Sequence, residues 1–302
     1  MEWFKLFTIW WSLIIINSFE LFYACPDPCT CNVTTNVIDC SNRGLSSIPA
    51  FRTIALSKIE LLDLSCNNLT VLNSSDFNNI LGFSVETIDV SLNRIVQIVG
   101  EFSDGNEAIG YRTLNLSNNA LTFFPRNIVP NKHLKGDLII DISNNFLEHL
   151  PAHMFADADS FYPGFQFSVR GNRLRSIHPN AFSGPIIVDA ILDFRNNHLE
   201  SIPETLKLPE GVRSIKMAGN PWKCDCNFRW IAGSLFQNYT KLSPPICNTP
   251  SGVSGRPLFG LTKSEFACAP EVDDNAPILE TEGANHVLVC RRNFSYNRRC
   301  HR

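Results

Sequence analysis

The eleven cysteines are the most reactive set of side chains in this 302-residue sequence, and eight of them gather in two clusters. The clusters consist of Cys25, Cys29, Cys31 and Cys40, and of Cys224, Cys226, Cys247 and Cys268. Each contains a C-x-C pair, whereas zinc sites commonly use C-x₂-C, so the pattern favours disulfides over a metal site. The spacing alone leaves three connectivities open for each cluster. Cys66, Cys290 and Cys300 lie outside both clusters; Cys66 and Cys300 are candidates for free thiols or an intermolecular bridge.

Other side chains that could support catalysis are scattered. Among the seven histidines, His149 and His153 are four residues apart, but Pro151 between them argues against a helix presenting both to one metal ion. The sequence contains no nucleophile elbow, phosphate loop or HExxH motif. We therefore expect no enzyme, no cofactor and no metal site.

Residues 1–24 are expected to be a signal peptide, because an apolar stretch from Leu6 to Ile16 follows a short polar start. Cleavage after Ala24 fits best, while a cut near Ser18 and an uncleaved signal anchor stay open. Six N-x-S/T sequons agree with secretion and glycosylation. They lie at Asn32, Asn68, Asn73, Asn115, Asn238 and Asn293.

The net charge of −3 gives no general drive toward nucleic acid or a membrane surface. No stretch after Cys268 is apolar enough to span a bilayer or to direct a lipid anchor. The chain is expected to be secreted, although a longer relative could be bound to the plasma membrane.

A repeat of about two dozen residues organises the centre of the chain. It recurs as "LLDLSCNNLTVL" from Leu61, "TLNLSNNALTFF" from Thr113 and "ILDFRNNHLESI" from Ile191. Its asparagines are Asn67, Asn93, Asn119, Asn145, Asn172, Asn197 and Asn220, at intervals of 26, 26, 26, 27, 25 and 23 residues. Apolar residues two apart, such as Leu62 and Leu64, indicate one short strand per repeat. The restarting apolar spacing and the prolines exclude one continuous helix.

The pattern resembles L-x-x-L-x-L-x-x-N-x-L, and the chain is identified as a member of the leucine-rich-repeat family over residues 36–222. The resemblance implies an α/β-type repeat solenoid, a horseshoe with short parallel strands on its concave face. It also implies a ladder of asparagine side chains from coil to coil, with repeats over residues 56–218. A second buried spine is expected from Phe77, Phe102, Phe155 and Phe182, with Ile128 and Leu206 in weaker copies. Asp137 occupies an inward position, so we expect local slippage that turns Leu138 inward instead.

Residues 25–55 and 219–268 resemble the cysteine-rich amino- and carboxy-terminal caps of extracellular leucine-rich-repeat proteins. That resemblance implies four bonds: Cys25–Cys31, Cys29–Cys40, Cys224–Cys247 and Cys226–Cys268. Trp222 and Trp230 are expected to pack over the last coil, because a cap covers apolar surface.

Residues 269–302 look like the start of an immunoglobulin-like domain, as in leucine-rich-repeat and immunoglobulin cell-surface proteins. Only twelve residues follow Cys290, so we expect an incomplete and largely disordered segment. Its basic end, residues 291–302, could bind heparan sulfate, although an incidental frayed tail is the favoured alternative.

The repeat register assigns side chains to the concave face. A first column reads Asp63, Asp89, Asn115, Asp141, Ser168, Asp193 and Lys216, and its neighbour reads Ser65, Ser91, Ser117, Ser143, Arg170, Arg195 and Ala218. Candidate partner-binding residues are Asp63, Asp89, Asp141, Arg170, Asp193, Arg195 and Lys216. The alternative is that the sequence "LDLS" is simply common in this repeat and says nothing about a partner. A glycan on Asn115 would shift the partner to a flank or to the convex side.

Together these patterns predict an extracellular protein-binding module, a secreted modulator or ligand-binding form of a cell-surface recognition or adhesion receptor. Three alternatives stay open: a matrix protein that binds glycosaminoglycan or matrix partners, an innate-immune recognition protein, and the amino-terminal fragment of a longer chain carrying immunoglobulin domains and an enzyme.

Overall fold

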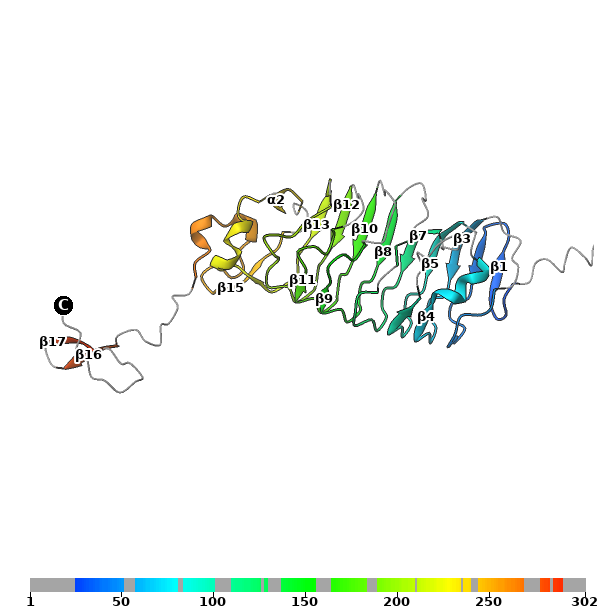
Figure 1. Ribbon diagram of the computed structural model, residues 1–302, viewed down its shortest axis with the longest axis horizontal. Coiled ribbons are helices and arrows are strands. Elements are labelled where there is room, and N and C mark those ends of the chain that lie inside the picture. Colours follow the sequence, from blue (N-terminus) through cyan, green and yellow to red (C-terminus); the bar gives the residue numbers. More distant parts are fainter. Residues whose placement is uncertain are drawn as a thin grey trace, which may run out of the picture.

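The chain winds into stacked coils, each of which adds a strand to one long wall of the molecule (Figure 1). This computed structural model describes residues 25–51, 58–80, 84–100, 110–125, 128–129, 137–155, 164–183, 189–209, 211–234, 236–239 and 244–268, and the backbone of 278–282 and 285–289. The expected signal peptide (1–24) and the basic end (291–302) lie outside these residues.

A nine-stranded sheet forms the wall, in the order β1-β2-β3-β5-β7-β8-β10-β12-β13. Its strands are β1 (Thr30–Asn32), β2 (Val37–Asp39), β3 (Lys58–Asp63), β5 (Ser84–Asp89), β7 (Gly110–Asn115), β8 (Leu138–Asp141), β10 (Phe165–Ser168), β12 (Ala190–Asp193) and β13 (Ser214–Lys216). Only β1 and β2 pair antiparallel; every later neighbour is parallel, because a whole coil separates successive strands. The predicted parallel-stranded repeat solenoid is confirmed.

Short elements complete the coils on the opposite side. β4 (Val71–Asn73) pairs with β6 (Gln97–Val99), and β9 (His149–Leu150) pairs with β11 (Ser176–Ile177), both in parallel. A 3₁₀-helix, η1 (Ser74–Ile80), follows β4. Within the described ranges, α-helix is confined to α2 (Phe236–Tyr239). Short strands, turns and 3₁₀ segments therefore form most of the side of the coils opposite the nine-stranded sheet.

The core is a set of columns that run the length of the stack. Inward residues from successive strands are at most 1% exposed: Leu62, Ile88, Leu114, Ile140, Phe167, Leu192 and Ile215. The second spine is buried at Phe77, Ile128, Phe155 and Phe182 and partly buried at Leu206, while Phe102 lies outside the described residues. Phe155 is the hub of an aromatic cluster, with ring centroids of Phe124, Phe165, Phe167 and Phe182 at 5.2–6.2 Å.

The expected slippage at Asp137 is present and continues beyond it. Asp137 is exposed and Leu138 is 1% exposed. Leu138 pairs with Phe165, which pairs with Ala190, so the next two coils keep the same shift. A Cβ on Gly164 would overlap the carboxylate of Asp137, so a larger residue there would require that exposed side chain to move. The repeat spacing alone did not predict the shift in these two coils.

Buried asparagines link the coils as the resemblance implied. The Oδ1 of Asn145 accepts the N–H of Leu121 at 3.0 Å, and its Nδ2 donates to the carbonyls of Leu116 and Ile142 at 3.0 and 3.1 Å. The same bonds to the preceding coil recur at Asn67, Asn93, Asn119, Asn172, Asn197 and Asn220. Each amide satisfies backbone groups that the turn buries away from water.

Disulfides close both ends. The structure joins Cys25 to Cys31, Cys29 to Cys40, Cys224 to Cys247 and Cys226 to Cys268, the four pairs that the resemblance implied. The carboxy-terminal end contains β14 (Trp222–Lys223), η3 (Cys226–Ile231), β15 (Cys247–Thr249), η4 (Leu258–Gly260) and η5 (Lys263–Glu265). There Trp222 is fully buried and stacks on Phe228, and partly buried Trp230 packs edge-on against Phe228 and Phe236.

In the tail, the structure describes the backbone of two strands. β16 (Ile278–Glu282) and β17 (Asn285–Val289) pair antiparallel as a hairpin. Cys290, Cys300 and the rest of the expected immunoglobulin-like segment lie outside the described residues.

Candidate partner-binding face

The first predicted column is aligned strand by strand on the sheet. Backbone register pairs Asp63 with Asp89, Asn115 with Asp141, and Ser168 with Asp193, which in turn pairs with Lys216. All seven members of the row are the last residues of their strands, and neighbouring strands of a sheet lie roughly 4.8 Å apart. Most are half-exposed, whereas Asp193 is 6% exposed. Asp39 on β2 extends the row, because it pairs with Asp63.

Each acid of this row also has a local structural task. The Oδ1 of Asp63 accepts the N–H of Ser65 at 2.9 Å, and the Oδ1 of Asp141 accepts the N–H of Ser143 at 2.8 Å. The same turn occurs at Asp39, Asp89, Asn115 and Asp193, with distances of 2.8–3.1 Å. Such turns stabilise the bend at the end of a strand. The recurrent "D-x-S" therefore has a structural role, and the second carboxylate oxygen has no hydrogen bond from a described residue at Asp63 and Asp141 but accepts one at Asp89 and Asp193.

The second predicted column needs a correction. Ser91, Ser117 and Ser143 were expected to face outward, but they are only 7–9% exposed. A serine side chain is too short to emerge from the bend where two coils pack together. Arg170 is long enough to emerge and is exposed, whereas Arg195 is half-buried.

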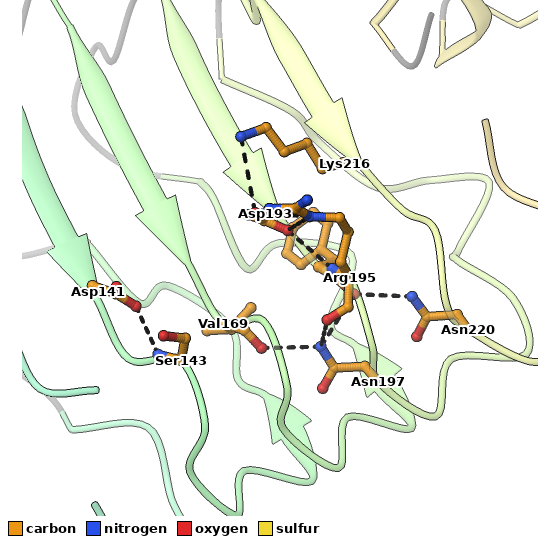
Figure 2. A network of polar contacts seen from close by, with 9 residues as sticks. Asp141, Ser143, Val169, Asp193, Arg195, Asn197, Lys216 and Asn220 are labelled. Atoms are coloured by element: carbon orange, nitrogen blue, oxygen red, sulfur yellow. Dashed lines mark hydrogen bonds and ion pairs between the residues drawn. The ribbon is translucent and has the colours of Figure 1, made fainter. Parts of the chain in front are cut away.

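In the carboxy-terminal part of the face, one acid is shared by two cations. Arg195 Nη2 lies 2.5 Å from Asp193 Oδ2, and Lys216 Nζ lies 4.0 Å from the same oxygen (Figure 2). The hydrogen bonds that Arg195 donates to Asp193 raise the pKa of Arg195. Arg170 forms no ion pair with any described residue. The structure thus separates two arginines that the sequence treats alike.

A second charged row was missed by the sequence analysis. Near the strand starts, Lys58 Nζ lies 3.0 Å from Glu60 and 3.1 Å from Glu86, and Arg112 Nη1 lies 3.2 Å from Glu86. Hydrogen bonds to Glu60 and Glu86 raise the pKa of Lys58. Glu86 and Arg112 are 26 residues apart, one repeat, which was the signal available in the sequence. The four charges cancel, so this row adds little net field.

Two sequon asparagines lie on strands of the nine-stranded sheet: Asn32 on its edge strand β1, and Asn115 on the inner strand β7. Asn115 is half-exposed, and its Nδ2 donates to Asp89 Oδ2 at 3.0 Å. Of the others, Asn32, Asn68 and Asn238 are exposed, Asn73 is half-exposed, and Asn293 lies outside the described residues. Their occupancy stays a prediction.

In the described ranges, the histidine and cysteine side chains do not come together as a catalytic or metal-binding group. His149 Nδ1 lies 2.8 Å from Ser176 Oγ, and Cys66 is an exposed free thiol. The described residues hold no cluster of three or more His, Cys, Asp or Glu side chains suited to a metal ion. None of the helices in the described part of the chain has the length and apolar character that crossing a bilayer requires.

Comparisons with known proteins agree with this architecture. The family described as "Leucine rich repeat C-terminal domain" matches residues 244–269. Human Immunoglobulin superfamily member 10 is 29% identical over 94 residues, which cover 26% of this chain and 4% of that protein. Bovine Leucine-rich repeat-containing protein 3B is 26% identical over 99 residues, which cover 32% and 38% of the two chains. The matches therefore span well under half the length of these relatives.

A solved structure shares the fold. The crystal structure of human 5T4 (Wnt-activated inhibitory factor 1, Trophoblast glycoprotein) superimposes with a TM-score of 0.51 at 19% sequence identity. The alignment covers 81% of this chain and 100% of that chain. At this identity the likeness concerns the fold alone.

Proposed function

We propose, from the premise that this chain is a leucine-rich-repeat protein with disulfide-bonded segments at both ends, that it is a non-catalytic extracellular module that binds another protein on its concave sheet. The four disulfides support an oxidising compartment, because such bonds persist outside the cytosol. The expected signal peptide and the exposed sequons fit the same compartment.

The aligned row of side chains that begins at Asp63 and ends at Lys216 carries this proposal. Strand spacing of roughly 4.8 Å makes the sheet a broad, regular surface, of the size that a protein partner covers. Most apolar side chains of these strands lie in the core, whereas Leu61, Ile139 and Ile191 are half-exposed, so the outer side combines a few apolar side chains with polar and charged groups. Such groups set orientation and association rate more than raw affinity.

The charge pattern refines which residues a partner meets. Asp63, Asp89 and Asp141 form no ion pair with a described residue, whereas Asp193 pairs with both Arg195 and Lys216, which leaves one positive charge in that group. The amino-terminal part of the face is therefore acidic and its carboxy-terminal part is basic, and Arg170 is the cation there that has no ion pair with a described residue. We propose that the partner brings basic groups to the first part and an acidic group to the second.

The glycan state of Asn115 sets a condition on this proposal. A sugar on its Nδ2 would stand between Asp89 and Asp141 and cover the acidic part of the face. We infer that the binding-competent form carries no glycan there. Glycopeptide mapping of the secreted protein measures the occupancy directly.

More finely, we propose a secreted modulator or ligand-binding form of a cell-surface recognition receptor. A partly matching relative carries the name Immunoglobulin superfamily member 10, which supports a link to immunoglobulin-containing proteins. The boundaries of the repeats (56–218) and of the caps (25–55 and 219–268) belong to this proposal.

Affinity capture with the secreted protein, followed by binding measurements on purified partners, tests the proposal. Reversing Asp63, Asp141 and Arg170 should weaken binding at least tenfold. A matched set that reverses Asp76, Glu204 and Lys263, which are exposed and lie outside the strands of the nine-stranded sheet, should leave it unchanged. Arg195 is a poor choice for reversal, because it would place two carboxylates together at Asp193. If the second set weakens binding and the first does not, the concave sheet is not the binding face.

A further inference from the structure

We propose that Arg170 and Arg173 form a two-guanidinium site that binds a single carboxylate side chain of the protein partner. This inference rests on the proposed function and specifies the chemistry of one part of the partner. Arg173 was not among the residues that the repeat register assigned to the concave face.

Arg170 stands in a coil that lacks the usual acid. In the next coil, Asp193 precedes Arg195 by two residues and holds its guanidinium with three hydrogen bonds of 2.5–3.1 Å. The residue at the same position before Arg170 is Ser168, which carries no charge. The Arg170 side chain is therefore exposed without a carboxylate partner among the described residues.

The guanidinium of Arg173 stacks on the aromatic ring of Phe146. Its guanidinium carbon lies 4.4 Å from the centroid of the Phe146 ring in the preceding coil, and its backbone N–H donates to Leu147 at 2.9 Å. A planar guanidinium stacked on a ring keeps its edge donors free for a carboxylate. Arg173 is exposed and forms no ion pair with a described residue.

No exposed side chain separates the two arginines along the chain, because Gly171 has none and Asn172 is buried in the ladder. Gly171 has φ +70°, and the side chain of Asn144 from the preceding coil lies where its Cβ would be. No other described coil has arginine at both positions. The equivalent pairs are Ser65 and Asn68, Ser91 and Arg94, Ser117 and Ala120, Ser143 and Phe146, Arg195 and His198, and Ala218 and Pro221. The pair of arginines flanking Gly171 is a departure from the repeat, not part of it.

The surrounding charges favour a single carboxylate over a polyanion. Glu148 and Glu200 are exposed in the flanking coils, and Arg175 donates its N–H to the backbone of Glu148 at 2.8 Å. A long sulfated glycan that runs from coil to coil past the two arginines would meet these carboxylates and be repelled. One Asp or Glu side chain that approaches from the concave side would meet only the two guanidiniums, which bind carboxylates with paired, charge-assisted hydrogen bonds.

Selection from a random peptide display library, with the full secreted protein immobilised, tests the site. Peptides selected on the wild type should be enriched in Asp or Glu, and their affinity should fall at least tenfold on the R170A/R173A variant. The R170K/R173K variant should recover only part of the loss, because an ammonium lacks the planar fork. R175A, which removes a neighbouring exposed arginine, should change affinity less than twofold. Circular dichroism and melting temperature check that each variant is folded.

The outcomes separate this site from the proposed function. Peptides that lose affinity on reversal of Asp63 and Asp141 but not on R170A/R173A would overturn the arginine site and leave the concave binding face standing. Peptides indifferent to all four residues would remove the proposed function as well. Heparin that binds the wild type, and is lost equally from R170A/R173A and R175A, would assign the arginines to a sulfated polymer and overturn the proposal.

Discussion

Replacing Asn145 with alanine should destabilise the solenoid by about 2–4 kcal/mol. Asn145 is 2% exposed, and its Oδ1 is the acceptor for the N–H of Leu121. The carbonyls of Leu116 and Ile142 keep a second donor from the neighbouring ladder asparagines, so the variant leaves one backbone donor unsatisfied. A buried unsatisfied donor costs about 1–3 kcal/mol, and the lost amide adds a small cavity.

Urea unfolding followed by tryptophan fluorescence, with disulfides intact, measures this loss. Asn144 is the matched control: it is the adjacent residue, exposed, with φ +54°, so N144G removes an amide at a position that glycine tolerates. A loss at N145A no larger than at N144G would refute the view that the ladder stabilises the stack.

The N145D variant tests the same bonds by charge. One oxygen can still accept from Leu121, but the other would face the carbonyls of Leu116 and Ile142. Burial beside carbonyl oxygens raises the pKa of a carboxyl group above its unfolded value of about 3.9. Stability of N145D should therefore be greatest below about pH 4 and fall as the pH rises, whereas N145A should show no such added dependence.

Three further perturbations address the core, the carboxy-terminal cap and the rim. Phe155→Ala should cost about 3–5 kcal/mol in urea unfolding because the ring is a buried hub, whereas Phe123→Ser, at a side chain 84% exposed, should cost little. Hydrogen bonds, led by the one from the Thr262 N–H, lower the pKa of Glu265 from 4.5 to about 2, so its contribution to stability is present above pH 4.5 and lost as the pH falls toward 2; Glu265→Gln should flatten that part of the pH profile. Gly171→Ala should lower the melting temperature, because its φ of +70° and the overlap with Asn144 both penalise a side chain.

The repeating part of the fold could be predicted from the sequence because its determinants recur at fixed intervals. The inward columns, the asparagine ladder and the slip at Leu138 each follow from periodicity and local chemistry. The continuation of the slip through Phe165 and Ala190 could not, because it depends on how each strand pairs with its neighbour. Sequence spacing fixes which face a residue is on, not the register of a shifted ladder.

The candidate face was predicted in position but not in chemistry. The register of Asp63 with Asp89 followed from the repeat, yet spacing does not reveal that one oxygen of each acid is bound to the backbone two residues later. Burial of Ser91 depends on packing between coils, which the alternation rule ignores. The difference between Arg170 and Arg195 depends on a single distance from the latter to Asp193.

The differences between the predicted and the observed face suggest where binding specificity lies. The repeated residues build the surface, and residues that depart from the repeat distinguish one part of it from another. Ser168 is such a departure, since an acid occupies the same place in the next coil and neutralises the arginine that follows. Restoring that acid as S168D should give Arg170 an internal partner and weaken carboxylate binding at least tenfold with both arginines present. S168N, with the same shape but no charge, should bind like the wild type, as Asn115 shows that the row accepts an asparagine. Measured by fluorescence polarisation with an acidic peptide selected on the wild type, equal affinities of S168D and S168N would show that charge compensation within the coil does not control the site.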